Sequence, residues 1–147
     1  MIINDMPCLI LSQYIIDSGY MSLPSLNSDW PIYTTYLPDG NNVNDNTGAA
    51  YDTTPLIDGR LMNSDFIQHY GVQLKIRCKS FNDGWDKINE IAISMDSVHN
   101  VSQAVNGTNY LIQNISRSSG PTFIGIEKGT KRRNLFSVNF LVTLKEI

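Results

Sequence analysis

The chain has 147 residues, of which 41% are hydrophobic and 17% charged, and its formal net charge is −3. This length fits one globular domain whose core needs neither a disulfide nor a metal ion. No apolar run reaches the roughly 18 residues that cross a membrane, and the first residues lack the positive charge of a signal peptide. We therefore expect a single domain over residues 1–147, with no membrane partner.

The charged residues are divided unevenly along the chain. Residues 1–59 hold seven aspartates and no Lys or Arg, whereas residues 60–147 hold all eleven bases and the other seven acids, so the two parts sum to −7 and +4. The missing cations argue against an N-terminal basic tail or a helix that binds nucleic acid or an anionic membrane. An acidic and a basic region in one domain favour a subunit that docks onto complementary partners.

Two segments have the pattern of helices. Residues 7–17 begin with Pro7, which suits a first helical turn, and Asp5 is available as a cap. Residues 83–98 place apolar side chains on one face, with Trp85, Ile88 and Met95 among them. We expect Trp85 to be a core anchor, so that Trp85→Ala costs roughly 3–5 kcal/mol.

The first strands are predicted around a long loop. Residues 32–37 and 51–57 have the composition of strands, and the stretch 38–50 between them is rich in turn residues. In residues 72–79 apolar side chains alternate with Gln73, Lys75, Arg77 and Lys79. This alternation predicts one buried face and one face that meets water or a partner.

The last third of the chain is predicted as an antiparallel meander. Strands are expected at 101–105, 110–116 and 122–127, with a loop at 118–121 and a basic turn at 128–133. A final long strand, suited to a central position, places Phe136, Val138 and Phe140 on one face. The whole order predicts an α+β fold, in which a mainly antiparallel sheet is flanked by two helices.

The sequence nominates no active site. His69 and His99 have no Cys or Glu at metal-ligand spacing, and no phosphate-binding or nucleophile-elbow motif occurs. Cys8 and Cys78 are expected to be buried thiols, with a disulfide or a nucleophile as the alternative. We expect a protein that is not an enzyme and binds no cofactor and no metal.

The segment from Asp58 to Thr143 carries the informative motifs. These are Asp58-Gly59-Arg60, the run from Tyr70 to Arg77 (YGVQLKIR), Trp85-Asp86-Lys87-Ile88 at the start of a helix, and the run from Arg133 to Phe140 (RNLFSVNF). Taken alone, the polar side of this segment is either a solvated edge or a surface for another subunit. In their order, these motifs resemble the minor capsid or tail terminator proteins of tailed bacteriophages.

The resemblance implies a structural protein of the virion. Members of this family form a six-fold ring at the head-proximal end of the tail tube, which stops tube growth and joins the tail to the head. The partners implied are further copies of the chain, the tail-tube protein and a head-completion protein, with DNA passing through the lumen without specific binding. The implied location is the phage neck, assembled in the host cytoplasm.

Two alternatives stay open at this stage. The chain can be another neck component, such as a head-completion stopper, or a tail-tube subunit; a small enzyme or ligand-binding domain is a further alternative. On the first hypothesis we expect the loop at 38–50 to reach an axial neighbour. The residues expected at subunit or partner interfaces are Asp39, Asp45, Asp58, Arg60, Lys75, Arg77, Lys79, Lys131, Arg132 and Arg133.

Overall fold

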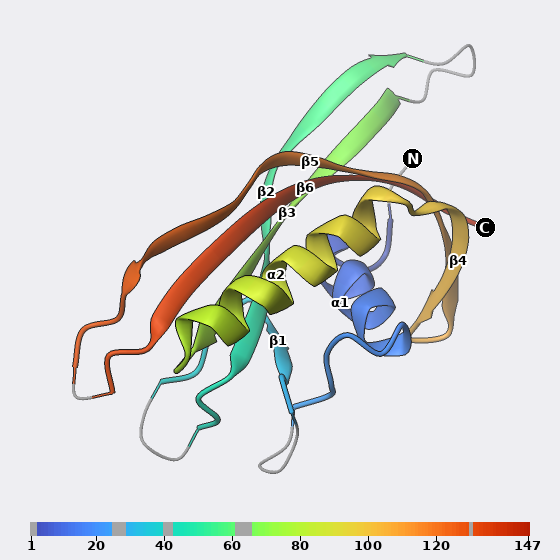
Figure 1. Cartoon of the computed structure of the whole chain (residues 1–147). Helices are drawn as coiled ribbons and strands as arrows, with labels where there is room; N and C mark the ends of the chain where they lie inside the picture. Colours follow the sequence, from blue (N-terminus) through green and yellow to red (C-terminus); the bar gives the residue numbers. More distant parts are fainter. Residues whose placement is uncertain (1–2, 25–28, 40–42, 61–65, 130) are drawn as a thin grey trace.

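A computed structural model describes residues 3–24, 29–39, 43–60, 66–129 and 131–147, with the side chains of 57–60 and 66–68 left out (Figure 1). The elements are α1 (Pro7–Asp17), β1 (Ile32–Thr34), β2 (Thr47–Arg60), β3 (Phe66–Cys78), α2 (Phe81–Asp96), β4 (His99–Val105), β5 (Thr108–Ile126) and β6 (Asn134–Glu146). The predicted α+β class, with a mainly antiparallel sheet and two helices, is confirmed.

The six strands form one sheet in the order β1-β2-β3-β6-β5-β4. Only β1 and β2 are parallel; each of the other neighbouring pairs is antiparallel. As predicted, the last strand β6 is central. The β2–β3 pair and the β5–β6 pair project from opposite ends of the sheet (Figure 1).

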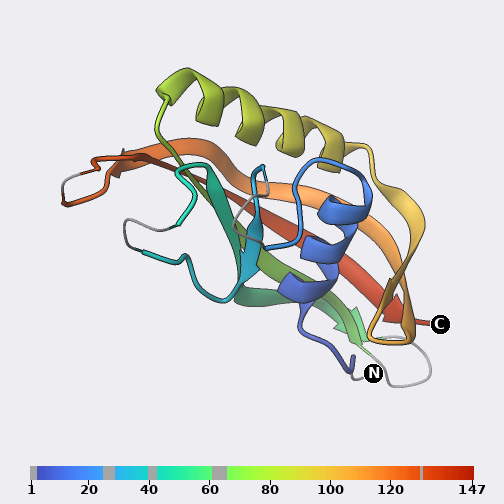
Figure 2. The ribbon, with the colours of Figure 1, turned by 90° about the horizontal axis from the view of Figure 1, so that it is seen from below.

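Both helices pack on the same face of the sheet (Figures 1 and 2). α1 contacts β1 to β4, and α2 contacts β3, β5 and β6. The side chains between the helices and the sheet include Leu74 and Ile76 of β3 and form one buried cluster. The predicted core residues Ile88, Met95, Phe136, Val138 and Phe140 are all buried there.

The N-terminus of α1 receives its cap from a distant strand. Pro7 occupies the first turn as predicted, but the N-cap residue Met6 makes no side-chain cap. Instead, a carboxylate oxygen of Asp52 in β2 accepts a hydrogen bond from the Cys8 backbone N–H at 2.9 Å. The expected cap, Asp5, accepts from the Tyr110 hydroxyl at 2.5 Å and thereby ties the first residues to β5.

The buried face of α2 begins with Gly84, the residue before Trp85, and continues through Ile88, Ile91, Ala92 and Met95. Gly84 is buried, and a Cβ at this position would lie 2.1 Å from Cys78 Sγ and 2.7 Å from Phe136 Cε2. Trp85 is 38% exposed, with its ring centroid 6.0 Å from that of Phe136. The prediction that Trp85 is a core anchor is therefore wrong. The helix lies close against Cys78 and Phe136 at a residue without a side chain, which a hydrophobic pattern does not register.

β5 is one continuous strand where the sequence predicted two strands and a loop. Its pairing with β6 shifts register between Arg117 and Ser119 and again between Ser119 and Thr122. Gly120 has φ +85°, and a Cβ there would lie 2.8 Å from the Ser137 carbonyl oxygen. The predicted turn residues thus form bulges against the long partner β6 and do not end the strand.

Candidate functional site

Arg77 lies on the sheet face opposite the helices, yet its side chain is 0% exposed. Its Nη1 donates a hydrogen bond to the Pro38 carbonyl at 2.6 Å, and its Nη2 donates to the Asn44 carbonyl at 3.4 Å. Both acceptors belong to the predicted loop, which therefore covers this end of the face. The expectation that Arg77 meets water or a partner is wrong for the single chain, because the chain's own loop buries it.

The predicted basic turn is joined to the same loop. Arg133 is 3% exposed and pairs with Glu127 through its Nε, and its Nη1 lies 3.5 Å from Asp45 Oδ1. Lys131 Nζ lies 3.4 Å from the same Asp45 oxygen. Asp45 therefore bridges the loop to the turn between β5 and β6. The exposure expected of Arg133 at a partner surface is also wrong for the single chain.

These groups form a charged cluster of three bases and three acids, made up of Arg77, Lys131, Arg133, Asp39, Asp45 and Glu127. Asp39 contributes at its rim, 3.4 Å from Arg77 Nη1 with a side chain that is 90% exposed. The formal charges of the cluster cancel. Part of the charge division along the sequence is thus neutralised within the single chain.

Burial governs the ionisation of this charged cluster. Burial and the neighbouring Arg133 charge lower the pKa of Arg77, against the opposing effect of Glu127. Burial alone would raise the pKa of Glu127, but hydrogen bonds from Arg133 and the charges of Arg133 and Arg77 outweigh it and hold the pKa below its ordinary value. Arg77 Nε has no hydrogen-bond partner among the described residues. Within the cluster, Arg133 is therefore the main partner that keeps the Glu127 carboxylate ionised.

The other predicted interface residues are not members of this cluster. Arg132 and Lys79 are exposed, and Lys75 is half-buried with its Nζ 5.4 Å from the centroid of the Tyr51 ring. Asp58 and Arg60 belong to β2, and their side chains fall outside the described part. The structure therefore does not gather the ten predicted residues into one surface.

The sheet face opposite the helices is polar and partly open. Asn139 Nδ2 donates to Ser119 Oγ at 2.6 Å, and His69 Nδ1 lies 2.6 Å from Thr143 Oγ1. Hydroxyl and amide groups predominate along its centre, where Lys75 is a charged exception. The described residues on this open face include the partly or fully exposed polar residues Tyr51, Thr53, Gln73, Lys75, Asn139 and Thr143, the buried Ser137, and the half-buried Leu135 and Leu141 of β6.

An exposed apolar patch lies where α2 begins beside β5. Phe81 and Phe123 are 45% and 40% exposed, and their ring centroids are 5.2 Å apart. Ile124 and Ile126 are 48% and 50% exposed. With Trp85 they form the apolar patch: Phe81, Trp85, Phe123, Ile124 and Ile126. The sequence analysis missed it, although the uncharged run from Thr122 to Ile126 was a signal.

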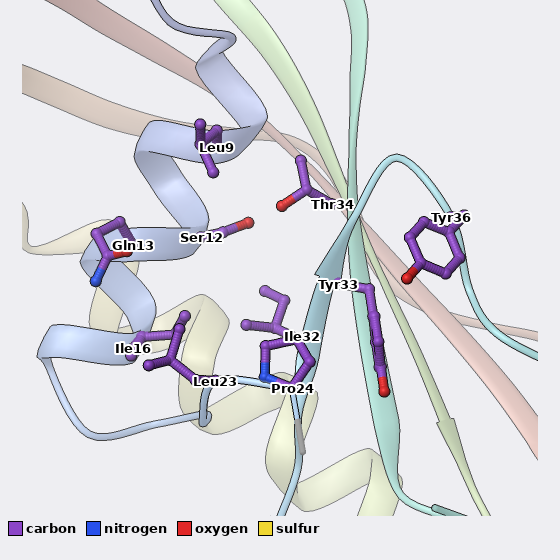
Figure 3. Close-up of a pocket in the computed structure, with 10 residues that line it drawn as sticks. All are labelled: Leu9, Ser12, Gln13, Ile16, Leu23, Pro24, Ile32, Tyr33, Thr34 and Tyr36. Carbon is purple, nitrogen blue, oxygen red and sulfur yellow. The ribbon is translucent and has the colours of Figure 1, made fainter. Parts of the chain in front are cut away.

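A groove of about 330 Å³ lies between α1 and β1 (Figure 3). Its lining is largely apolar, and Leu9, Ile16 and Leu23 contribute to it. Ser12 donates to the Cys8 carbonyl at 2.7 Å and Gln13 donates to Asp17 at 2.9 Å, so both polar groups of the helix are engaged within α1. The described lining contains no Asp, Glu, His, Lys or Cys. The titratable or hydroxyl groups of the lining are those of Ser12, Tyr33, Thr34 and Tyr36.

The cysteines are not placed for chemistry. Burial, reinforced by Asp52, raises the pKa of Cys8 to about 12, and burial raises the pKa of Cys78 to about 11. Both are free thiols and stay protonated at neutral pH. Among the described residues no three His, Cys, Asp or Glu side chains are grouped to hold a metal ion, and no described helix is long and apolar enough to cross a membrane.

Comparison with known proteins identifies no family. No family model matches the chain, and no curated protein matches it. Twelve chains of solved structures match. One of these, which bears no description of function, aligns with 91% of this chain and 88% of its own length at 15% identity, with a TM-score of 0.41.

Proposed function

We propose that the chain is a structural protein of a tailed phage, a ring subunit at the head-proximal end of the tail that terminates the tail tube and joins it to the head. The observation that carries the proposal is the contrast between the two sheet faces. One face is covered by both helices, and the other is half-exposed and mainly polar, with Leu135 and Leu141 among its hydroxyl and amide groups and Lys75 and Lys145 as its charges. A sheet of this kind suits the wall of a channel, with the helices outside and the open face inside.

The chemistry of the open face supports passage of DNA. A channel lined by arginines and lysines would bind the phosphate backbone and retard the DNA. Here Arg77 is withdrawn under the loop and paired, and hydroxyl and amide groups dominate the centre of the face. Such groups allow hydrated DNA to slide, because none offers a fixed counter-charge.

The ends of the subunit would then meet the axial partners. The loop and the basic turn are held together by Asp45 at one end of the sheet, and the exposed residues Arg132 and Lys79 lie near this end. We assign this end to a contact with either the tube or the head-completion protein. The internal pairing of the cluster fixes its shape before any partner binds.

The experiment is a gene deletion in the phage that encodes the chain, combined with antibody labelling of intact virions. We expect labelling at the neck and, in the deletion, overlong or unjoined tails. Heads that lose their DNA would instead indicate a head-completion stopper, and an absence of tubes would indicate the tube subunit. Virions that carry no trace of the chain would overturn the proposal of a structural role.

A further inference from the structure

Two long strands of the sheet are only half covered by their outer neighbours. β1 pairs with β2 at Gly48 to Ala50, and β4 pairs with β5 no further than Asn114. In the described part of the chain, residues 51–60 of β2 and 116–126 of β5 therefore have no strand on their outer side. We call these segments the β2 edge and the β5 edge. Such edges are sites for pairing with another chain.

The β5 edge is protected unevenly against such pairing: residues 116–121 contain Arg117, Pro121 and two register shifts, whereas residues 122–126 have only the shift between Phe123 and Gly125. Residues 122–126 carry no charge and no proline, and Phe123, Ile124 and Ile126 are 40–50% exposed. The Phe81 ring of the apolar patch lies beside this edge, 5.2 Å from the Phe123 ring, and the Trp85 ring lies 6.0 Å from Phe136 of the neighbouring β6. An incoming strand would thus gain main-chain hydrogen bonds and bury aromatic surface, the combination that typifies strong contacts. On the β2 edge Pro55 removes one donor, at a point where the pairing with β3 is already irregular.

The directions of the strands allow the two edges to pair with each other. Between the edges lie β3 and β6, and each successive pair from β2 to β5 is antiparallel. β2 and β5 therefore run in opposite directions. A copy placed beside the first in the same orientation brings its β2 edge antiparallel to the β5 edge of its neighbour. This contact uses two different surfaces, so it can repeat around a ring.

The positions of the edges set the offset between neighbours. The β2 edge lies beside β3 residues 66–73, whereas the β5 edge lies, across β6, beside β3 residues 71–78. If the two edges pair, each copy is displaced along the strand direction by about five residues, or about 17 Å, relative to its neighbour. The four strands β2, β3, β6 and β5 of one copy span about 19 Å across the sheet. Strands in a closed sheet with this shear tilt by about 40° to the ring axis, within the usual range for barrels.

We propose that neighbouring copies of this chain join by pairing the β2 edge of one with the β5 edge of the next, which makes the sheet continuous from subunit to subunit. The inference deepens the proposed function and rests on it for the closure of the ring. The occupant is a second copy because the chain itself supplies the complementary edge, antiparallel and on the opposite side of the sheet. The open polar faces of all copies then line the same side.

The first test is disulfide trapping with two single variants, Thr54→Cys on the β2 edge and Thr122→Cys on the β5 edge. Both positions are exposed, and the native cysteines are buried, so the wild-type protein is the blank. Under mild oxidation we expect the mixture of variants to form a cross-linked dimer and neither variant alone to do so. Cross-linking by Thr122→Cys alone would mean that β5 pairs with β5, and no cross-link at the highest soluble concentration would mean no edge pairing; either result overturns the proposal.

The second test blocks the β5 edge with Ile124→Lys, since an inserted lysine prevents strand addition. Ile93→Lys is the matched control, because Ile93 is 65% exposed on α2. Added to the Thr122→Cys background, Ile124→Lys should lower the cross-linked yield at least tenfold and Ile93→Lys should not. Equal yields overturn the proposal. If antibodies label the neck but the edge variants do not change cross-linking, the edge pairing is refuted and the proposed function stands. If the edges pair but the chain is absent from virions, the proposed function is refuted and the edge pairing stands.

Discussion

The contacts in the charged cluster predict which of two arginine substitutions, Arg77→Met or Arg133→Met, destabilises the fold more. The predicted order is the reverse of the order that the burial of the two side chains would suggest. Arg77 is more completely buried than Arg133, but Arg77→Met should cost less than Arg133→Met. In Arg77→Met the protein loses one good charged hydrogen bond, to the Pro38 carbonyl at 2.6 Å, and two long ones at 3.4 Å, to the Asn44 carbonyl and to the exposed Asp39 carboxylate. A hydrogen bond to a charged group contributes about 1.5–3 kcal/mol, and removal of the unpartnered Nε returns about 1 kcal/mol. The expected net loss is about 1–3 kcal/mol.

Arg133→Met leaves Glu127 in a different position. This carboxylate is 14% exposed and, among the described residues, would keep Arg77, at 4.0 Å, as its cationic partner. Breaking a buried ion pair on one side typically costs about 3–5 kcal/mol. Urea unfolding at neutral pH, followed by circular dichroism, measures both losses. A loss for Arg77→Met equal to or larger than that for Arg133→Met would refute the reasoning that Glu127 is held chiefly by Arg133.

Three further predictions concern other parts of the fold. Trp85→Ala should cost only about 1–2 kcal/mol because the ring is 38% exposed, whereas Phe136→Ala should cost about 3–5 kcal/mol; equal losses in urea melts would contradict the assigned core. Because the folded-state pKa of Glu127 lies below its ordinary value of 4.5, its ionised form stabilises the fold above pH 4.5, and this contribution disappears as the pH falls through the folded-state pKa. Glu127→Gln should therefore make the unfolding free energy less dependent on pH below 4.5, and identical pH profiles would count against the pair. Cys8 and Cys78 should react with a thiol reagent at pH 8 only after denaturation, because their pKa values are raised to about 12 and about 11; rapid labelling of the native protein would disprove their burial.

Local sequence patterns predicted both helices and the regions of the strands, but not the bounds of β2 and β5. Alternation in residues 72–79 and the long apolar face around Val138 predicted β3 and a central β6, because period-two patterns survive in any half-buried sheet. The helical spacing of Ile88 and Met95 predicted α2 for the same kind of reason. The expectation that the chain is not an enzyme remains a prediction.

The tertiary structure decided where charges and termini are satisfied. Arg77 reads as one of four polar side chains on a wet strand face, and only the return of the loop over the sheet buries it. The cap of α1 comes from Asp52, 44 positions beyond Cys8, a partnership that no local pattern encodes. The local sequence shows how buried and exposed positions alternate along one helix or strand. The partners of Arg77 and of the α1 N-terminus come from distant segments that the fold places beside them, and a local pattern does not specify these.

The two uncovered edges likewise follow from how the strands pair, which the sequence did not predict. Sequence predicted strands near both edges but also a loop at 118–121, which would have divided the β5 edge. Continuous pairing with β6 keeps that edge intact, and the short β1 and β4 leave both edges open. Pairing likewise settled part of the charge division along the sequence: Asp39 and Asp45 of the loop meet the basic turn in the charged cluster, and the sheet edges become the surfaces proposed to join copies.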